Sequence, residues 1–282
     1  MISVAKARAL YASELQFTTR MRSAQLQAAF GKVPREDFVG PGPWRVRSPW
    51  DLAVYWTTED ADPRHVYHDV LIALDEKRLI NNGQPSLWAY QFDRLDIKSG
   101  EEIVHLGCGT GYYTAIMAEL TGPEGKVTGI ELAPKLAARA RAALAPWHQV
   151  QVQNADGASI ALPPSDVIVA SAGATHPQQS WLDAIRMGGR LLFPMTVTHG
   201  SGCMLLATRR TETAFEARFL SSVSFIGFSG ARDEDVSNRL LNAFRRDRGT
   251  RVRSLRCDAH PEDETCWLHG EGWCLSCAEV TV

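Results

Sequence analysis

The sequence predicts an α/β fold with a doubly wound, mostly parallel sheet. From about Glu101 onward, short apolar runs alternate with longer amphipathic ones, as strands and helices alternate in such a sheet. The predicted strands "EIVHL" and "DVIVAS" are apolar nearly throughout, which is typical of strands covered by helices on both faces. A glycine-rich turn, "GCGTG", separates the first strand from the first helix. This pattern predicts a ligand-binding sheet whose site lies at the carboxyl ends of the strands.

Before the sheet, the first forty residues are expected to be helical. Ala, Leu, Glu, Arg and Gln dominate this part of the chain, and the pattern breaks at Pro34 and the glycines around it. The Pro-, Trp- and Tyr-rich stretch over residues 41–69 is expected to be an irregular connection or an insertion. We assign residues 1–95 to an N-terminal helical segment that leads into the sheet.

The sheet-forming core is predicted to span residues 96–230. Its strands are expected at 102–106, 125–131, 149–154, 166–171 and 189–195, and its helices at 112–120, 134–147 and 179–187. Two further strands at 203–210 and 215–228 follow with no helix between them, so an antiparallel edge is expected. Residues 231–282 form a small C-terminal extension, with a helix near its start and short extended pieces after it.

Charge and composition exclude several function classes. A net charge of −2 gives no general attraction to nucleic acid or to an anionic membrane, so neither is expected as a partner. No apolar run approaches the length of a membrane-spanning helix, and the N-terminus lacks the apolar core of a signal peptide. We therefore expect a cytoplasmic protein with reduced cysteines. The sequence does not indicate an oligomeric state.

The glycine turn fits one cofactor better than two others. A Walker loop needs a lysine after its second glycine, and "GCGTGYYT" has none. A dinucleotide turn needs a small residue five positions after its first glycine, where this chain has Tyr112. The turn is instead similar to the G-x-G-x-G turn of S-adenosylmethionine-dependent methyltransferases, in which bare backbone lies against the cofactor. We therefore predict S-adenosylmethionine as the cofactor. The turn residues assigned to it are Gly107, Cys108, Gly109, Thr110 and Gly111.

Acidic residues follow the second and third predicted strands. Glu131 ends the second strand, where a carboxylate can accept hydrogen bonds from both ribose hydroxyls. Asp156, in "QNADGAS", is placed to contact the adenine edge. Each acid alone is also explained as a solvated strand end or a turn former, but their order after a glycine turn favours cofactor binding. The remaining predicted cofactor contacts are Leu132, Gly157 and Ser171.

Several segments, taken together, resemble one family. The segments "RMRSAQLQAAFGKVPREDFVG", "VYHDVLIALDEKRLINNGQPSLWA" and "DVIVASAGATHPQQSWLDAIRMGGRLLFPM" follow the order found in protein-L-isoaspartate O-methyltransferases, over approximately residues 17–230. This resemblance implies a class I, Rossmann-like methyltransferase with S-adenosylmethionine as its cofactor. It also implies a carboxylate of a peptide or small acid as the methyl acceptor.

The resemblance departs at one position. The family's Ser-Gln-Pro places its serine beside the methyl-accepting carboxylate, and the corresponding residues here are Gly83, Gln84 and Pro85. The resemblance therefore assigns Asn82, Gly83 and Gln84 to the acceptor site, and Gln84 also to the cofactor. The preceding Asn81 and Asn82 are candidate replacements for the missing donor. The same "NNGQP" is also a strong turn signal, and binding residues often lie on such turns.

Two other functions stay open from the sequence. The missing serine and the extra segments also fit a methyltransferase of a small-molecule metabolite, or a non-catalytic protein that retains the cofactor pocket. His176 is a candidate general base, although a lone loop histidine is more often a polar surface residue. A carboxylate acceptor needs no base, because it is ionised at neutral pH. The aromatic residues Trp88, Tyr90, Tyr112 and Tyr113 either shield the cationic methyl centre or pack in the core.

The C-terminal extension carries a cluster of cysteines and histidines. Its spacings, Cys-x-x-His twice and Cys-x-x-Cys once, are able to bind zinc, but six candidate ligands are more than a tetrahedral site uses. The segment "CWLHGEGWCLS" also fits a hairpin in which buried cysteines act as small hydrophobic residues. We assign no metal from the sequence. The six candidates are Cys257, His260, Cys266, His269, Cys274 and Cys277.

Overall fold

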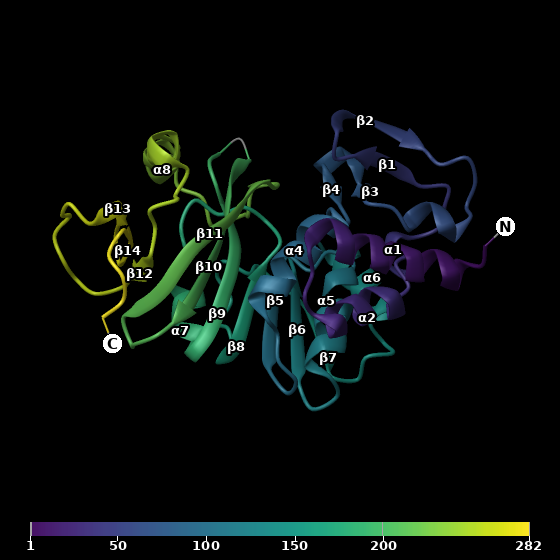
Figure 1. Ribbon diagram of the computed structural model, residues 1–282, viewed down its shortest axis with the longest axis horizontal. Coiled ribbons are helices and arrows are strands. Elements are labelled where there is room, and N and C mark those ends of the chain that lie inside the picture. The colour runs from purple at the N-terminus through teal and green to yellow at the C-terminus, as the bar shows by residue number, and fades with distance from the viewer. Residues whose placement is uncertain (1, 199, 282) are drawn as a thin grey trace. The chain divides into compact units, whose positions relative to one another are not determined.

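The computed structural model describes residues 2–198 and 200–281. The chain forms two compact units that alternate along the sequence. Residues 1–100 and 108–154 make up the first unit, and residues 101–107 and 155–282 make up the second. Each unit therefore combines residues that are distant in the sequence, whereas the sequence analysis divided the chain into three consecutive segments. The boundaries of those three segments stay a prediction. Each unit is described by itself (Figure 1).

The first unit begins with the predicted helices. Ser3 and Ser23 cap α1 and α2 by accepting hydrogen bonds from backbone N–H groups of Lys6 and Leu26, and Pro34 follows the end of α2. Further helices α4, α5 and α6 accompany the parallel strands β6 and β7. The elements are α1 (Val4–Thr19), α2 (Ala24–Lys32), α3 (Glu36–Val39), α4 (Pro85–Leu95), α5 (Tyr112–Thr121), β6 (Lys126–Glu131), α6 (Pro134–Ala143) and β7 (Val150–Asn154).

The stretch over residues 41–69 is not the irregular connection that the sequence predicted. It contributes the strands β1 (Arg45–Ser48) and β2 (Asp51–Thr57), which pair with β3 (Leu71–Asp75) and β4 (Ile80–Asn81) in the order β2-β1-β3-β4. The segments "RVRS" and "DLAVYWT" contain β-branched and aromatic residues, which favour strands. The prolines and tryptophans of this stretch led to the prediction of a loop instead. Two short 3₁₀ helices, Pro63–Val66 and Glu76–Arg78, complete this part of the unit.

The core of the first unit is aromatic. Tyr112 and Tyr113 begin α5, and both rings are buried, with centroids 5.0 Å apart. Trp88 of α4 lies 5.2 Å from the Tyr113 ring, and Phe38 lies 5.8 Å from the Tyr112 ring. These aromatic side chains therefore pack in the core, which was one of the two interpretations that the sequence left open. Their packing fixes the start of α5, and with it the end of the glycine turn.

The second unit is a mixed sheet with the strand order β13-β14-β12-β11-β10-β9-β8-β5. The pairs β5·β8 and β8·β9 are parallel, whereas every later pair is antiparallel, as predicted for the edge. The helix α7 ends at Ala184, because β9 begins at Ile185 and takes residues that the sequence assigned to the helix. The elements are β5 (Glu102–Leu106), β8 (Ser165–Ala170), α7 (Gln179–Ala184), β9 (Ile185–Thr196), β10 (Ser201–Arg209) and β11 (Ala214–Ser224).

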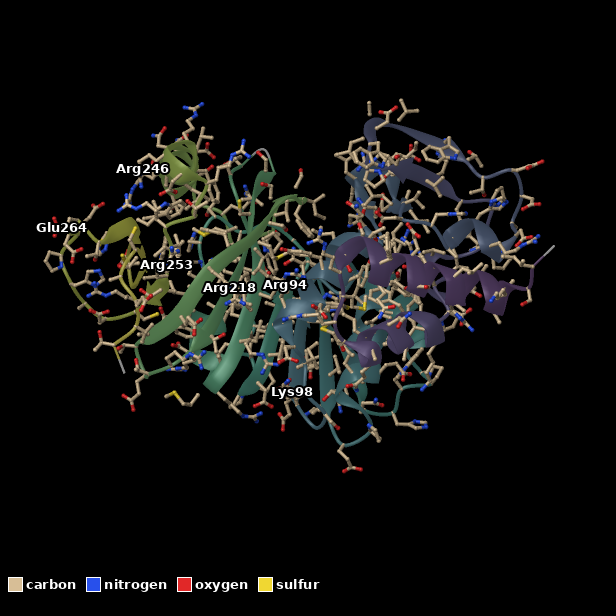
Figure 2. All side chains as sticks on the ribbon, in the orientation of Figure 1. Arg94, Lys98, Arg218, Arg246, Arg253 and Glu264 are labelled. Atoms are coloured by element: carbon tan, nitrogen blue, oxygen red, sulfur yellow. The ribbon has the colours of Figure 1, made fainter. Side chains whose placement is uncertain are left out.

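The C-terminal extension belongs to the second unit. It consists of α8 (Glu234–Asp247), β12 (Ser254–Arg256) and a hairpin of β13 (Cys266–Gly270) and β14 (Trp273–Ser276). Arg246 projects from α8, and Glu264 lies in the loop that joins β12 to β13 (Figure 2). Trp267 packs against Phe244 of α8 and Phe219 of β11, with ring centroids 5.5 Å from each. The predicted helix and extended pieces are therefore confirmed, and they share a core with β11.

Within the described residues, no helix combines the length and the apolar character that crossing a membrane requires. All six cysteines carry free thiols.

Candidate active site

The three glycines of the turn adopt a backbone conformation that favours glycine. Gly107, Gly109 and Gly111 have φ angles of +71°, +60° and +95°, in the left-handed region that residues with a Cβ rarely adopt. A Cβ at Gly111 would lie 2.5 Å from Cδ1 of the buried Leu144, so this glycine is also required by packing. A Cβ at Gly109 would meet only Leu74, at 3.7 Å, and this part of the turn presents bare backbone.

Two side chains within the turn are buried. The sulfur of Cys108 lies 3.1 Å from where a Cβ on Gly129 of β6 would be. The backbone N–H of Cys108 donates a hydrogen bond to the Ile130 carbonyl (3.1 Å). Burial raises the pKa of this thiol far above its usual value, so it stays neutral. Thr110 is different, because its buried Oγ1 has no hydrogen-bond partner among the described residues. A buried hydroxyl without a partner is costly and is often satisfied by a ligand or water.

Glu131 lies at the end of β6, and its carboxylate is held in a fixed orientation. Oε2 accepts a hydrogen bond from the Gly109 N–H (2.8 Å), and Oε1 accepts one from the Ala133 N–H (2.9 Å). Burial raises the pKa of Glu131, and the two N–H groups oppose that shift because they stabilise the charged form. Each oxygen has a second lone pair, so the group can accept two further hydrogen bonds. The next residue, Leu132, exposes 50% of its surface beside it.

Within the second unit, Gly107 and Ser171 lie close together. Ser171 follows β8, and its N–H donates to the carbonyl of Leu106 at the end of β5 (2.8 Å). A hydrogen bond of 2.8 Å joins its Oγ to Nε2 of His105. Burial lowers the pKa of His105 to about 3, so the ring is neutral at physiological pH. The hydrogen bond to His105 orients the Ser171 side chain, and a Cβ on Gly107 would lie 3.9 Å from the Ser171 carbonyl carbon.

Asp156 and Gly157 lie on a turn after the third predicted strand. Asp156 Oδ1 accepts a hydrogen bond from the Ala158 N–H (3.0 Å), as a turn-forming aspartate does. The Gly157 carbonyl accepts one from the Trp181 indole (2.9 Å), and a Cβ at this glycine would lie 3.0 Å from Phe228. Asp156 therefore forms a turn, which was one of the two roles that the sequence left open. Its second carboxylate oxygen, Oδ2, can accept a further hydrogen bond.

A buried arginine shapes the predicted acceptor loop. Arg35, from "VPREDFV", is fully buried, and its Nε donates to Oδ1 of Asn82 (3.0 Å). Its four other N–H groups donate to backbone carbonyls between residues 66 and 83, so all five donors are satisfied. The Asn82 side chain is therefore anchored toward the protein interior. Asn81 is equally occupied, since its Oδ1 accepts the Gly83 N–H (2.8 Å).

Gly83 occupies a tight position. Its φ is +75°, and a Cβ there would lie 2.9 Å from the Trp88 indole nitrogen and 3.1 Å from Cε2 of Tyr113. The Tyr113 hydroxyl donates to the Gly83 carbonyl (3.2 Å). A serine would be strained in this backbone conformation. The rings of Trp88 and Tyr113 occupy the space that a side chain at position 83 would need.

Gln84 belongs to a polar network that the sequence analysis missed. Its amide nitrogen donates to Asp69 Oδ2 (3.0 Å) and to Ser86 Oγ (2.8 Å). Asp69 also accepts the Ser86 N–H (2.8 Å) and the Ser86 hydroxyl (2.7 Å) at the start of α4. A carboxylate at a helix N-terminus is favoured by the helix dipole. Asp69 therefore orients the side chains of both Gln84 and Ser86. Ser86 carries a hydroxyl three residues after Gly83 in the sequence.

His176 is half-buried, and burial lowers its pKa. Its Nδ1 lies 2.9 Å from Thr175 Oγ1, and its Nε2 lies 3.1 Å from the Gln178 amide nitrogen. The ring stacks on Trp273 of β14, with centroids 6.1 Å apart. His176 is therefore a partly exposed polar residue in contact with the C-terminal extension, and its role as a general base stays a prediction.

The sequence analysis missed three residues that position the site. Arg35 and Asp69 hold the loop predicted to bind the acceptor, and His105 holds Ser171. The arginine lies within the segment that resembles the family, but its five partners are scattered over residues 66–83. A single histidine within an apolar strand is the one signal for His105 that the sequence contains. Side-chain pairs of this kind depend on loop geometry, which the sequence pattern does not specify.

Comparisons with known proteins agree on one family. Residues 9–233 match the model of the protein-L-isoaspartate(D-aspartate) O-methyltransferase family. The chain is 32% identical to protein-L-isoaspartate O-methyltransferase 1 of Rhodopseudomonas palustris (strain HaA2) over 229 residues, which cover 78% of this chain and 84% of the relative. It is also 32% identical to the protein-L-isoaspartate O-methyltransferase of Methanocella arvoryzae over 209 residues, which cover 70% of this chain and 99% of the relative.

Two solved structures share the fold. A protein-L-isoaspartate O-methyltransferase aligns with a TM-score of 0.63 at 20% identity, covering 83% of this chain and 69% of the other. A structure described as a beta-aspartate methyltransferase from Plasmodium falciparum, in complex with S-adenosyl-L-homocysteine, aligns with a TM-score of 0.63 at 14% identity, covering 79% of this chain and 98% of the other. The predicted α/β fold class is therefore confirmed. The residues beyond 233 lie outside the family match.

Proposed function

Because the chain belongs to the protein-L-isoaspartate(D-aspartate) O-methyltransferase family, we propose that it transfers the methyl group of S-adenosylmethionine to the carboxylate of an isoaspartyl residue in a peptide or protein. Its enzyme class is that of the family, an S-adenosylmethionine-dependent methyltransferase. Gly83 stands where the family resemblance places a serine beside the methyl acceptor.

One observation carries the cofactor part of this proposal. The buried Glu131 carboxylate is fixed by the N–H groups of Gly109 and Ala133, so its remaining lone pairs are oriented before any ligand arrives. Such a carboxylate suits the two hydroxyls of a ribose. The unpartnered Thr110 Oγ1 and the bare backbone at Gly109 also fit a ligand that lies against the turn.

The residues proposed to hold the cofactor follow from these features and from the family resemblance. Glu131 accepts the ribose hydroxyls, Asp156 accepts from the adenine amino group, and the exposed Leu132 offers apolar surface to the adenine ring. The glycine turn lies against the amino-acid part. The full proposed set is Gln84, Gly107, Cys108, Gly109, Thr110, Gly111, Glu131, Leu132, Asp156, Gly157 and Ser171.

The acceptor is proposed to bind beside Asn82, Gly83 and Gln84. Bound S-adenosylmethionine supplies an electrophilic methyl group on a sulfonium sulfur. An acceptor carboxylate oxygen forms a bond to the methyl carbon while the carbon–sulfur bond breaks, giving a methyl ester and S-adenosylhomocysteine. No base is needed, because the carboxylate is already ionised. The protein contributes orientation and exclusion of water, which account for large rate effects in such displacements. Arg35 and Asp69 fix the loop that provides this orientation.

The test is transfer of a labelled methyl group to matched peptides. We expect an isoaspartyl peptide to be labelled, and its aspartyl counterpart and free dicarboxylic acids to be labelled far less. The label should be released as methanol in mild base, as a methyl ester requires. Calorimetry with S-adenosylhomocysteine is run beside it. Ligand binding without transfer to the isoaspartyl peptide would contradict the proposed acceptor, whereas absence of binding would contradict the cofactor site itself. Transfer to a metabolite alone would favour the small-molecule alternative.

A cytoplasmic location is a separate part of the proposal. Six free thiols, three of them only half-buried, suit a reducing compartment. Fractionation of cells that express the protein would test this.

A further inference from the structure

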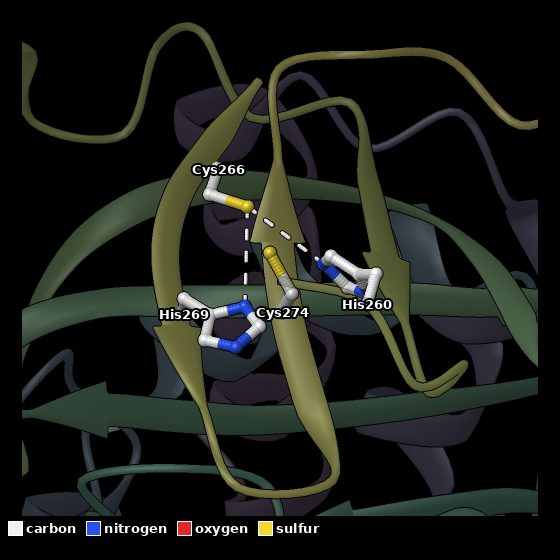
Figure 3. Close-up of side chains that lie close together, drawn as sticks. All are labelled: His260, Cys266, His269 and Cys274. Carbon is white, nitrogen blue, oxygen red and sulfur yellow. Dashed lines mark hydrogen bonds between the residues drawn. The ribbon is translucent and has the colours of Figure 1, made fainter. Parts of the chain in front are cut away.

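Four of the six cysteines and histidines in the C-terminal extension converge. His260, Cys266, His269 and Cys274 each direct one ligand atom to a common point, and these atoms all lie within 4.8 Å of one another (Figure 3). Cys266 Sγ is 3.7 Å from His260 Nε2 and 3.9 Å from His269 Nδ1. Cys274 is buried, and the His260 side chain exposes only 9% of its surface.

The hairpin places three of these residues on one face. His269 and Cys274 are direct cross-strand partners, and Cys266 pairs with Ser276, which shares a strand face with Cys274. In a regular strand Cys266 and His269 would point to opposite faces, because their positions differ by three. The register of β13 shifts between Cys266 and Leu268, and this irregularity brings both side chains to the same face.

The fourth residue comes from the preceding loop. His260 lies between β12 and β13, and its ring packs edge-on against His269 with centroids 4.9 Å apart. Its Nδ1 is 2.9 Å from the Asp258 carbonyl oxygen, to which it donates when Nε2 carries the lone pair. Nε2 is the atom that faces Cys266. A backbone partner that fixes the tautomer in this way is the usual companion of a metal-binding histidine.

Asp263 also contacts Cys266. The Asp263 N–H donates to Cys266 Sγ (3.4 Å), and Asp263 Oδ1 lies 3.6 Å from the same sulfur. The other two cysteines stand apart from the cluster. Cys277 lies one position beyond Ser276, at the end of β14, and Cys257 follows β12 at a site beside Arg209 and Asp183. The structure therefore reduces the six candidates of the sequence to four.

We propose that His260, Cys266, His269 and Cys274 bind one zinc ion in tetrahedral coordination. Two sulfur and two nitrogen ligands are a typical zinc set. With zinc–sulfur bonds of about 2.3 Å and zinc–nitrogen bonds of about 2.0–2.1 Å, the ligand atoms of a tetrahedron lie roughly 3.3–3.8 Å apart. The distances of 3.7 and 3.9 Å already lie near this range, so a small inward movement closes the site. On binding, the two thiols release their protons to solvent.

The site is structural rather than catalytic. Four protein ligands leave no open position for a substrate or a water molecule. The ion ties the loop that carries His260 to the hairpin, and the hairpin packs against α8 through Trp267. The whole arrangement lies outside the family match, which ends at residue 233.

The test measures metal in the untagged full-length protein. After expression with zinc and dialysis against metal-free buffer, mass spectrometry of the metal content should find about one zinc ion per chain. Cys274→Ser and Cys266→Ser should lose most of it, whereas Cys277→Ser and Cys257→Ser should retain it. His260→Cys preserves a ligand and should also retain zinc, whereas His260→Ala should not.

A second measurement does not depend on variants that fold. Cobalt(II), added to wild-type protein stripped with a chelator, should give the intense visible bands of tetrahedral coordination together with thiolate charge transfer. Wild-type protein that holds well below one equivalent of zinc and gives no such spectrum would overturn the proposal. Equal loss of zinc from the Cys277→Ser and Cys274→Ser proteins would overturn the ligand assignment. Methyl transfer is not the readout, so failure of the proposed function would not affect this result.

Discussion

At the scale of single residues, Glu131 illustrates how a buried charge can serve a ligand. The acid at the end of β6 is removed from water, which opposes its ionisation, yet two backbone N–H groups hold it in position. The cost of burying the carboxylate is offset when hydroxyl groups of a ligand complete its hydrogen bonds. This geometry supports the proposed role of Glu131, which is to accept two hydrogen bonds from the cofactor ribose.

We expect Glu131→Gln to weaken S-adenosylhomocysteine binding about ten- to hundredfold, since a hydrogen bond to a charged group contributes about 1.5–3 kcal/mol. Burial raises the pKa of Glu131, and ribose hydroxyls bind the ionised form. The wild-type affinity should therefore decline as pH falls into the range of this raised pKa, whereas the variant should show little pH dependence there. Calorimetry at several pH values measures both. Equal pH profiles for the two proteins would exclude this role, and the exposed Glu124→Gln serves as the control.

Gly83 permits a matched pair of substitutions. Its φ is +75°, and a Cβ there would lie 2.9 Å from the Trp88 indole nitrogen, so any side chain is unfavourable. We expect Gly83→Ala and Gly83→Ser to lower the free energy of unfolding by similar amounts, about 1–3 kcal/mol, and neither to raise methyl transfer. Urea titrations and labelled-methyl assays measure these effects. A gain in isoaspartyl methylation with Ser but not with Ala would show that the missing hydroxyl was what limited the reaction.

At the scale of elements, the start of α5 depends on Gly111. A Cβ there would clash with Leu144 in addition to requiring a φ of +95°. Gly100 is a suitable control, since its φ is +82° and a Cβ there would meet nothing within 4 Å. We expect Gly111→Ala to destabilise the protein by about 2–4 kcal/mol and Gly100→Ala by about 1–2 kcal/mol. Denaturant unfolding compares the two, and equal losses would show that Leu144 moves aside.

Asp93 joins two helices, and its charge makes that junction dependent on pH. Burial alone would raise the pKa of this carboxyl, but the N–H groups of Ser23 and Arg22 and the Arg22 guanidinium outweigh it, so the pKa lies below its usual value. A lowered folded-state pKa contributes stability above the unfolded pKa, and this stability is lost as pH falls through the folded one.

Asp93→Asn should therefore lower the free energy of unfolding by about 1.5–3 kcal/mol at neutral pH. The difference from wild type should shrink as pH falls and vanish in strong acid, where Asp93 is itself protonated. Thermal or urea unfolding across a pH series measures this. The exposed Asp37→Asn is the control, and a difference that stays constant into acid would contradict the linkage.

Most elements could be predicted because their periodicity is strong. The parallel strands and their helices have long apolar runs, and glycines or prolines mark their ends. The strands β1 and β2 were missed because prolines and tryptophans suggested a loop, and β2 keeps Leu52, Val54 and Trp56 exposed on an edge. The alternating apolar residues of β2 therefore do not mark a buried face of the sheet. The boundary between α7 and β9 was missed because Ile185, Arg186 and Met187 continue a helical pattern into the strand.

At the scale of the whole molecule, the C-terminal extension completes the second unit. Phe219 of β11 packs on Phe244 and Trp267, and β12 covers one edge of β11. A chain ending at residue 233, where the family match ends, lacks Phe244 and Trp267, so it exposes the Phe219 ring and the edge of β11 that β12 covers at residues 214–216. We expect this truncated protein to aggregate or to melt well below the full-length protein. Soluble yield and thermal unfolding test it, and an unchanged melting temperature would show that the extension is an independent addition.

The sequence predicted only part of the candidate site, because some of its residues are brought together by contacts between distant parts of the chain. The residues of the glycine turn and Glu131 lie close in sequence to elements with clear signals. Arg35, Asp69 and Ser86 act through partners brought together by loops, and the choice of four metal ligands among six depends on a register shift in one strand. Such long-range geometry follows from how the units fold rather than from any local pattern.

The order of these units along the chain affects how the protein is made. β5 belongs to the second unit, but β6, α6 and β7 of the first unit are synthesised before its partner β8. As the nascent chain leaves the ribosome, the edge of β5 that β8 will cover stays open until Ser165–Ala170 emerges. That interval is when this apolar strand is most available to chaperones or to neighbouring nascent chains.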